Sequence, residues 1–195
     1  MQPSLLSLVI TVVFNRTTLD SDFEKQLVES CRRGDRKAQH TLYSRYSRAM
    51  YNTCFRMLKS EADAEDALQN AFIEVFMKLD SYRFESTIGA WIKRIVINTC
   101  INHLKKRRLM TVDWDERVPE PEDDPVDTSD QEYQVEKVKK AIETLPDGYR
   151  VVLSLYLLEG YDHAEIGEIL NISEATSKSQ YSRARQKVRS MLIEA

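Results

Sequence analysis

The stretch DHAEIGEILNISEATSKSQYSRAR, residues 162–185, carries the pattern that decides the fold. Asp162 and Glu165 form a capping-box start for a short helix. Asn171 suits the left-handed position that ends such a helix, and Ser173 suits the N-cap of the next one. The stretch therefore predicts a short helix, a tight turn and a longer helix that runs to the end of the chain.

The longer helix, expected over about Glu174–Ile193, is basic on its solvent side. Between Lys178 and Arg189 the sequence has Lys and Arg but no Asp or Glu. Lys, Arg and Gln suit base edges, and Ser and Thr near a helix start suit phosphates. A helix-turn-helix that binds duplex DNA is therefore favoured over a solvated basic helix in a bundle. The residues expected to contact DNA here are Ser173, Thr176, Lys178, Ser179, Gln180, Arg183 and Arg185.

Helical periodicity also organises residues 21–109. The first pattern breaks at Gly34–Asp35 into a short helix and a long one. A second pattern starts at Ser60, a residue type that caps helices. A third runs over Ile88–Leu104 and ends in the basic run Lys105–Arg108. These patterns predict a first helical domain.

Residues 110–132 lose this periodicity and hold ten acidic residues against a single Arg117. Such a composition buries too little apolar surface to offset the entropy of ordering, so we expect a flexible linker. Residues 133–195 then form the second domain. The predicted fold class is all-α, with two small helical domains joined by an acidic linker.

Composition sets outer limits on function. The 195 residues are 42% hydrophobic and 30% charged, which is typical of a soluble globular chain. The net charge of −3 conceals two basic segments separated by the acidic one. Residues 1–20 contain an apolar run, Leu5–Phe14, that is too short to span a bilayer. We expect a disordered leader or residues upstream of the true start.

No catalytic or metal-binding constellation stands out. The three cysteines and three histidines are scattered without ligand spacing, so we expect no metal and no disulfide. The sequence also shows no nucleophile–base pair and no phosphate-binding glycine loop. We expect a protein without a catalytic site, without a cofactor and without a small-molecule substrate.

Aromatic and basic residues alternate at the start of the third pattern. Aromatic rings can stack on unpaired bases while cations hold the phosphate backbone. Trp91 alone is also typical of a core position. Taken together, the segment favours binding of melted or single-stranded DNA. Its candidate residues are Tyr82, Arg83, Phe84, Trp91, Lys93, Arg94, Asn98, Asn102, Lys105, Lys106, Arg107 and Arg108.

An acidic amphipathic stretch covers Glu61–Phe76. An exposed acidic helix is usually only a solvated face, but Phe72 and Phe76 lie one turn apart and need not both be core. The stretch would therefore suit binding to a helix of a partner protein.

Together these stretches resemble the extracytoplasmic-function (ECF) sigma factors of the sigma-70 family, over roughly Leu27–Met191 without the linker. Residues 63–72 resemble the region-two helix that binds the clamp coiled coil of RNA polymerase. Residues 84–108 resemble the part that opens and reads the −10 element. Residues 161–185 resemble the region-four helix-turn-helix that reads the −35 element.

The resemblance implies a cytoplasmic transcription initiation factor. Its expected partners are promoter DNA, core RNA polymerase, through the clamp coiled coil and the flap of the large subunits, and an anti-sigma factor. The aromatic and basic residues above would then bind −10 DNA, and the helix-turn-helix residues −35 DNA. The residues expected to bind polymerase are Asp63, Glu65, Asp66, Gln69, Asn70, Phe72 and Phe76.

The chain departs from the family pattern at three helix-turn-helix positions. Ala175 stands where Gly is common, Ser177 where an apolar residue is common, and Gln180 where a basic residue is common. Gln180 is expected to point toward the groove, so the −35 sequence stays open. The rival hypothesis is a stand-alone helix-turn-helix repressor or activator, which would leave the acidic and the aromatic-basic stretches unused.

Overall fold

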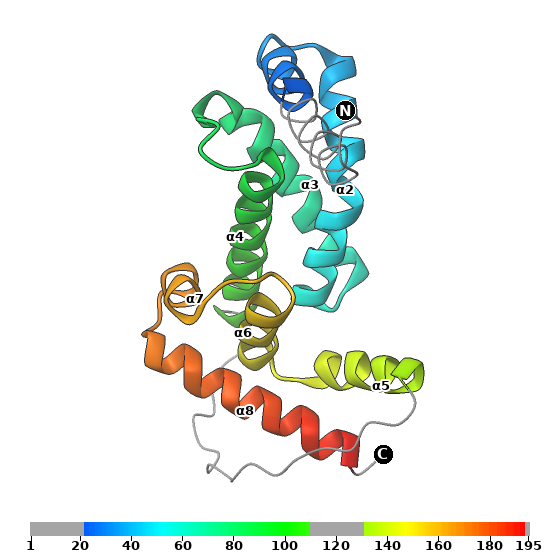
Figure 1. The fold of residues 1–195 in the computed structure, drawn as a ribbon, viewed down its shortest axis with the longest axis vertical. Coiled ribbons are helices and arrows are strands. Elements are labelled where there is room, and N and C mark those ends of the chain that lie inside the picture. The colour runs from blue at the N-terminus through cyan, green and yellow to red at the C-terminus, as the bar shows by residue number, and fades with distance from the viewer. Residues whose placement is uncertain (1–21, 110–130, 194–195) are drawn as a thin grey trace, which may run out of the picture.

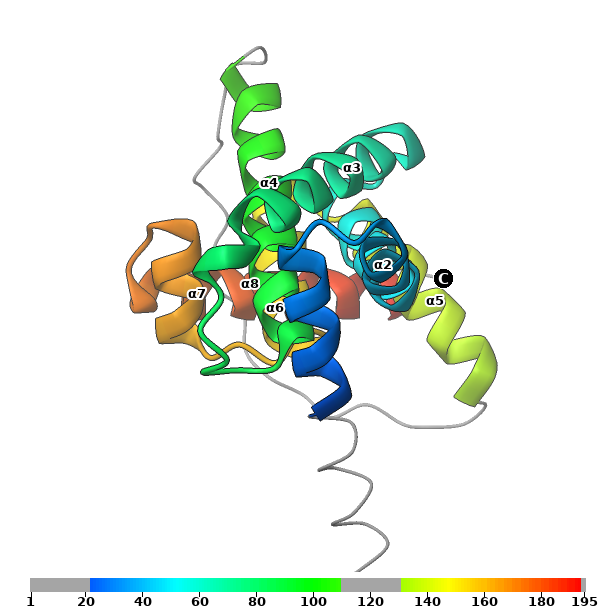
Figure 2. The same ribbon diagram turned by 90° about the horizontal axis from the view of Figure 1, so that it is seen from above.

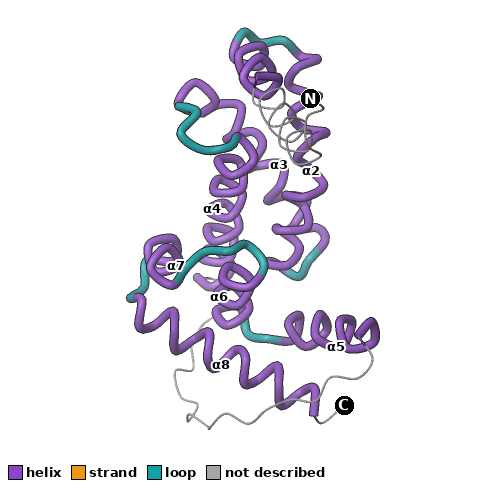
Figure 3. Tube along the Cα trace, viewed as in Figure 1, coloured by secondary structure: helices purple, strands orange, loops and turns teal. Residues whose placement is uncertain are grey.

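The computed structural model describes residues 22–109 and 131–193. Within these ranges the chain forms helices joined by short loops, and Figure 3 shows no strand in them. The predicted all-α fold is confirmed. The leader and most of the acidic linker lie outside the described residues.

The first half begins with a helical segment over residues 22–32, which ends before Gly34–Asp35 as expected. Asp35 caps the next helix by accepting hydrogen bonds from Lys37 N and Ala38 N, and Ser60 caps the one after it. The last helix of this half ends at Leu109, directly after the basic run Lys105–Arg108 in which it was predicted to end. The remaining elements are α2 (Arg36–Leu58), α3 (Glu61–Lys78), the 3-10 turn η1 (Leu79–Ser81) and α4 (Ile88–Leu109).

The second half consists of four helices gathered at one end of α4 (Figure 1). The longest of them, α8, packs against the other three. Figure 2 shows the same molecule from above, with α8 farther from the viewer than α2 and α4. The four helices are α5 (Gln131–Thr144), α6 (Asp147–Leu157), α7 (His163–Leu170) and α8 (Glu174–Ile193).

Helix α6 lies between two hydrophobic cores. The larger core joins α2, α3 and α4 and also takes in Val151, Val152 and Leu155 of α6. The smaller core holds Leu153 of α6 among residues of α5 and α8. A helix that is apolar around most of its circumference is stable only when it is covered on several sides. The apolar run of α6 is therefore explained by contacts with both halves of the chain.

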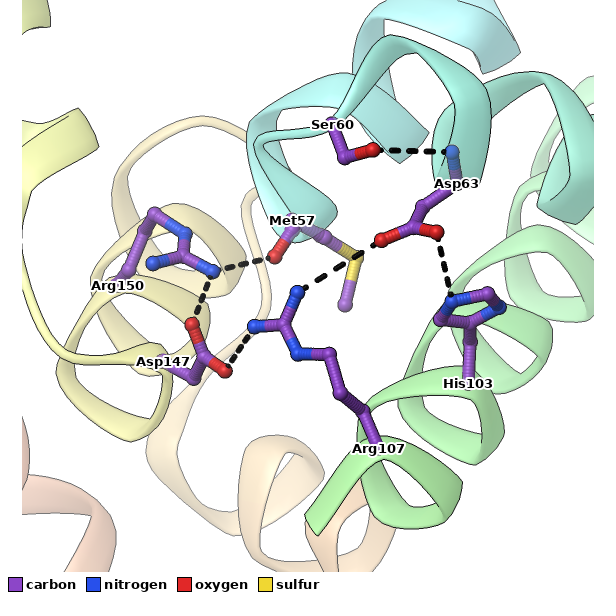
Figure 4. Close-up of polar contacts among 7 residues, drawn as sticks. All are labelled: Met57, Ser60, Asp63, His103, Arg107, Asp147 and Arg150. Atoms are coloured by element: carbon purple, nitrogen blue, oxygen red, sulfur yellow. Dashed lines mark hydrogen bonds and ion pairs between the residues drawn. The ribbon is translucent and has the colours of Figure 1, made fainter. Parts of the chain in front are cut away.

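Arg150 of α6 is fully buried and ties the two halves together (Figure 4). Its Nη2 donates hydrogen bonds to the carbonyl of Met57 at 2.8 Å and to Asp147 Oδ1 at 2.6 Å. Its Nη1 donates to the carbonyl of Leu145 at 2.9 Å. A buried charge is tolerated when it is paired and hydrogen-bonded in this way. The guanidinium thus connects the C-terminal end of α2 to the start of α6.

Asp147 also reaches across to α4. Arg107 Nη2 lies 2.5 Å from Asp147 Oδ2, and Arg107 Nη1 lies 3.7 Å from Asp63 of α3. Burial alone would raise the pKa of Asp147, but Arg150 and Arg107 outweigh it and hold that pKa below its usual value. The aspartate is therefore charged at neutral pH and bridges two arginines.

A second ionic contact involves Glu159, which follows α6. Its side chain is 4% exposed and is paired with Arg56 of α2 and with Lys93 of α4, whose Nζ lies 2.9 Å from Glu159 Oε2. Thr53 donates a further hydrogen bond at 3.1 Å. Burial raises the pKa of Glu159, and the two cations lower it by more, so that the pKa lies below its usual value.

We expect Arg150→Met to lower the free energy of unfolding by about 3–5 kcal/mol, because it leaves two buried carbonyls without their donor and Asp147 with Arg107 as its remaining partner. Urea denaturation followed by circular dichroism measures this. Lys140→Met, at an exposed position of α5, is the control and should change stability by less than about 0.5 kcal/mol. Equal stability of the two variants would contradict the role given to Arg150.

We expect Glu159→Gln to destabilise the protein by about 1–3 kcal/mol at neutral pH, because charged hydrogen bonds are lost. A carboxylate with a lowered pKa stabilises the fold fully above its unfolded-state pKa, and loses that effect as the pH falls through its folded-state pKa. The difference between wild type and variant should therefore shrink below about pH 4. Urea denaturation across this range measures it, and a difference that does not change with pH would refute the ionic contact.

Candidate nucleic-acid and partner interfaces

The helix-turn-helix forms as predicted from residues 162–185. Glu165 N donates to Asp162 Oδ1 at 2.8 Å and the Glu165 carboxylate accepts from Asp162 N at 2.9 Å, which completes the capping box. Asn171 ends α7 in the left-handed conformation, with φ 57°. The turn packs tightly, since a Cβ added to Gly167 would lie 2.9 Å from the carbonyl oxygen of Ile172. Glycine is required here for that close approach.

The inner side of α8 is buried and its outer side carries the predicted DNA contacts. Ser177, Ala184 and Val188 are buried beneath the helix. Ser173 caps α8 by accepting from Thr176 N at 3.0 Å. The seven predicted residues all retain exposed surface: Ser173, Lys178 and Arg185 are exposed, and Thr176, Ser179, Gln180 and Arg183 are half-buried.

An aromatic cluster behind α8 was not predicted. The rings of Tyr156 and His163 stack with centroids 4.5 Å apart, and Tyr181 lies 4.5 Å from Tyr156. The guanidinium of Arg185 lies over the ring of Tyr181 at 5.8 Å. His163 Nδ1 is also within hydrogen-bond distance, 3.0 Å, of the hydroxyl of Ser177. The polar residue at position 177 therefore has a partner on α7, which explains how it is accommodated in the interior.

The aromatic segment before α4 is a packed loop. Tyr82 is buried, and its ring lies 4.7 Å from Phe84 and 5.3 Å from Trp91. Phe84 is exposed and has φ 62°, a conformation that is strained for a bulky side chain and that is often found at functional sites. Trp91 is half-buried and packs against the core. The structure therefore exposes Arg83 and Phe84 and places Tyr82 beneath them.

Arg32 stabilises this loop by contacts that the sequence pattern did not indicate. Its side chain donates to the carbonyl of Leu79 at 3.0 Å and to the carbonyl of Tyr82. Its guanidinium also lies 5.2 Å from the centre of the Phe84 ring. Because the two residues are about fifty positions apart, no local pattern connects them.

The polar residues of α4 divide into two groups. One group forms an exposed stripe, since positions three or four apart lie on the same side of a helix. The other group comprises Lys93 and Arg107, which face the C-terminal half and are paired with Glu159 and Asp147. The side chain of Arg108 lies outside the described residues. The exposed stripe consists of Arg94, Asn98, Asn102, Lys105 and Lys106.

The polar residues on the acidic side of α3 also divide into exposed residues and one residue that is paired within the molecule. Glu65, Asp66, Gln69 and Asn70 are exposed, whereas Asp63 is half-buried, with one oxygen 3.3 Å from His103 Nε2 and the other near Arg107 (Figure 4).

The aromatic residues of α3 lie further inward. Phe72 is 3% exposed and packs edge-on against Tyr43 at 4.7 Å, so it belongs to the core, while Phe76 is half-buried. The acidic side continues instead into exposed Ile73 and Met77, which the sequence reasoning did not select although they follow Asn70 at helical spacing.

The described residues contain no group of three or more potential metal ligands. Cys31, Cys54 and Cys100 are buried as free thiols. None of the described helices is long and apolar enough to cross a membrane. The candidate surfaces are therefore the exposed sides of α3, α4 and α8.

Two sequence families match the chain. Sigma-70 region 2 matches residues 42–109, and Sigma-70, region 4 matches residues 136–188. The first range includes α3 and α4, and the second includes the helix-turn-helix. The two families therefore cover the same segments that carry the candidate interfaces.

Several characterised relatives match over most of their length. The sequence is 31% identical to the ECF RNA polymerase sigma-E factor of Escherichia coli K12 over 180 residues, 85% of this chain and 92% of the relative. It is 30% identical to the ECF RNA polymerase sigma factor SigW of Bacillus subtilis over 182 residues, 86% of this chain and 96% of the relative.

Two solved structures share the fold. One is CnrH in complex with the cytosolic domain of CnrY, with a TM-score of 0.54, 20% identity and coverage of 88% of this chain and 97% of that one. The other is the sigma factor RpoE of Bartonella quintana in complex with the anti-sigma factor NepR, with a TM-score of 0.54, 23% identity and coverage of 78% and 95%. From the two sigma-70 regions in their proper order and the identity to these relatives along nearly the whole chain, the protein belongs to the extracytoplasmic-function sigma factors of the sigma-70 family.

Proposed function

We propose that this sigma factor holds core RNA polymerase through the exposed side of α3 and contacts promoter DNA through α4 and α8. As a member of its family it directs RNA polymerase to specific promoters at the start of transcription. The observation that carries the assignment is the separation of three exposed surfaces of different chemistry on three helices. The surface of α3 is acidic and apolar. The surface of α4 and the loop before it is basic and aromatic, and the surface of α8 is basic and also carries Gln and Ser side chains.

The polymerase surface comprises Glu65, Asp66, Gln69 and Asn70 and extends to Ile73 and Met77. An acidic patch beside exposed apolar side chains suits a helical partner with a basic edge. Phe72 supports this surface from beneath, since its ring is buried. We infer that the clamp coiled coil binds here.

The −10 surface combines the loop at Arg83 and Phe84 with the exposed stripe of α4. An exposed ring in a strained loop can stack on an unpaired base, and Asn and Lys side chains along α4 can hold the strand that follows. Tyr82 and Arg32 act as supports for that ring. We propose that residues 21–109 form the unit that performs this step.

The −35 surface is the outer side of α8, in a unit formed by residues 133–195. Arg185 is exposed, and its guanidinium lies over the ring of Tyr181, which supports it on the outer side of α8. Lys178 lies 2.7 Å from Glu174 on the same helix, an exposed pair that a phosphate can readily displace. Gln180 is the residue best suited to read a base edge, because its amide can bond bidentately to adenine.

A stand-alone repressor explains less. It would use α8 but would give no role to the acidic side of α3 or to the aromatic loop. We further propose that the protein acts in the cytoplasm without catalysis of its own, and that an anti-sigma protein covers its polymerase-binding and DNA-binding surfaces. Of the two solved structures, one is RpoE in complex with the anti-sigma factor NepR, and the other is CnrH in complex with the cytosolic domain of CnrY. Both complexes support this proposal.

We expect Asp66→Arg to reduce promoter-dependent run-off transcription by core polymerase about tenfold, because a reversed charge at the centre of an interface costs about 1–2 kcal/mol or more. Asp66 is exposed, so the fold should be kept. Fragmented genomic DNA of the source organism serves as template. Glu143→Arg on α5 is the control and should transcribe like wild type. If neither variant nor wild type stimulates core polymerase while the protein alone shifts duplex DNA, the repressor hypothesis replaces ours.

Two substitutions on α8 should have different consequences. Lys178→Ala is expected to weaken binding of the holoenzyme to all promoter sequences and to lower the salt slope by about one, as loss of a phosphate contact does. Gln180→Ala should relax the preference at one −35 position, with a change of about 1–3 kcal/mol. Selection from a randomised −35 library at two salt concentrations measures both effects. Identical sequence preferences in wild type and Gln180→Ala would remove Gln180 from the reading surface.

A further inference from the structure

We propose that the turn between the helical segment 22–32 and α2 is a further DNA-binding surface, which holds phosphates of the unpaired strand just downstream of the −10 element. The surface consists of Arg33, Arg36 and Lys37, and we call it the basic turn. The proposal rests on the proposed function, because it extends the −10 surface beyond Phe84.

The sequence around the basic turn has an uneven distribution of charge. Residues 30–59 contain eight Lys and Arg side chains and a single acidic residue, Asp35. Helix α2, which takes up most of this range, contains no Asp or Glu. A block of one sign in a chain whose net charge is −3 indicates a surface that meets a polyanion or an acidic partner.

Arg36 and Lys37 lie at a place where a helix disfavours cations. They are the first two residues of α2, and the positive end of the helix macrodipole repels them. Asp35 caps this end by accepting hydrogen bonds from Lys37 N and Ala38 N. Local rules of this kind are broken mainly at functional sites, so the two cations indicate a function other than stability.

The acidic side chains near the basic turn are already paired. Glu29 Oε1 lies 2.7 Å from Arg32 Nη1, and Asp80 Oδ1 lies 3.9 Å from Arg32 Nε. Within residues 22–109 and 131–193, no acidic side chain forms an ion pair with the basic turn, whose three side chains are exposed. Their positive charge is therefore available to a ligand.

Arg32 connects the basic turn to the −10 loop. Its guanidinium donates to the carbonyls of Leu79 and Tyr82 and lies 5.2 Å from the centre of the Phe84 ring. Figure 2 shows the end of the first helical segment, in blue, beside the green loop that precedes α4. Residues 32 and 37 are separated by at most about 18 Å of chain. A strand that leaves Phe84 covers such a distance in about five nucleotides or fewer.

The order of the surfaces along the DNA identifies which nucleotides reach the basic turn. The chain leaves α4 at Leu109 toward the −35 unit, so that end of α4 lies on the upstream side of the −10 element. Phe84 precedes the opposite end of α4 and therefore lies on the downstream side. A strand that follows the exposed stripe of α4 to Phe84 continues toward the basic turn.

DNA suits the basic turn better than an acidic protein segment does. Positions 33–37 hold no apolar side chain larger than hydrogen, whereas the centre of a protein interface is usually apolar or aromatic. Phosphates require only cations and hydrogen-bond donors, which position the strand without reading its sequence. The basic turn is also continuous with the ring that captures an unpaired base.

The test measures how much the holoenzyme gains from DNA downstream of the −10 element. Two fork templates carry the strongest promoter mapped by the run-off assay, with an unpaired non-template strand. In one template this strand ends with the −10 element, and in the other it continues by about five nucleotides. Holoenzyme is assembled with Escherichia coli core RNA polymerase, and fluorescence anisotropy measures binding at several salt concentrations.

The variant Arg36→Gln with Lys37→Gln removes two charges from the basic turn. The matched control, Lys25→Gln with Lys140→Gln, removes the same charge from exposed positions outside it. Urea denaturation of both variants reports on the fold. The variant of the basic turn should be at least as stable as wild type, because its cations are unfavourable at the start of α2.

We expect wild type and the control to bind the longer template about tenfold more tightly than the shorter one. In the variant of the basic turn this gain should fall to about twofold, while binding of the shorter template stays unchanged. The salt slope on the longer template should fall by about 1.4, which is about 0.7 for each lost contact to a single strand.

An equal gain in the variant of the basic turn and in the control would overturn the proposal. A weaker affinity of that variant for core polymerase without DNA would also overturn it, and would make the basic turn a polymerase contact. Failure of the proposed function would look different. The run-off assay would then yield no promoter, or wild-type holoenzyme would bind neither template more tightly than core polymerase does, and the extension would fail with it.

Discussion

The position of α6 depends on one buried guanidinium, that of Arg150. It satisfies carbonyls from both halves of the chain and fixes Asp147, and α6 carries apolar residues into two cores at once. Because a buried charge without partners is very unfavourable, Arg150 and its acceptors must form together or not at all. The hydrogen bonds of Arg150 therefore fix the position of α6 relative to α2, because they tolerate little displacement. The apolar residues of α6 then pack into both cores from that position.

The helices were predictable because their signals are local. Capping residues such as Ser60, Asp162 and Ser173 lie within three positions of the groups they bond, and apolar spacing shows which side of each helix is buried. The same logic predicted the helix-turn-helix and the exposed side of α8. The end of α4 was predictable too, because a run of basic residues such as Lys105–Arg108 favours a helix C-terminus.

The contacts between distant segments were not predictable. Arg32 meets Tyr82 and Phe84 across about fifty positions, and Glu159 meets Arg56 and Lys93 across more. A lone charged residue in a sequence does not indicate its partner, so Lys93 and Arg107 could only be read as free cations. Phe72 and Tyr82 were selected for their aromatic chemistry, and the structure shows both as buried supports. Exposed Ile73 and Met77 were passed over because they resemble ordinary core residues.

The glycine at position 167 and the caps around it have an evolutionary consequence. All the groups that shape the turn, from the Asp162–Glu165 box to Asn171 and Ser173, bond to one another or to the backbone. The outward residues of α8 therefore contribute little to the geometry of the motif. They can mutate almost independently of stability, so that a duplicated copy of such a protein can acquire a new set of target genes through a few substitutions.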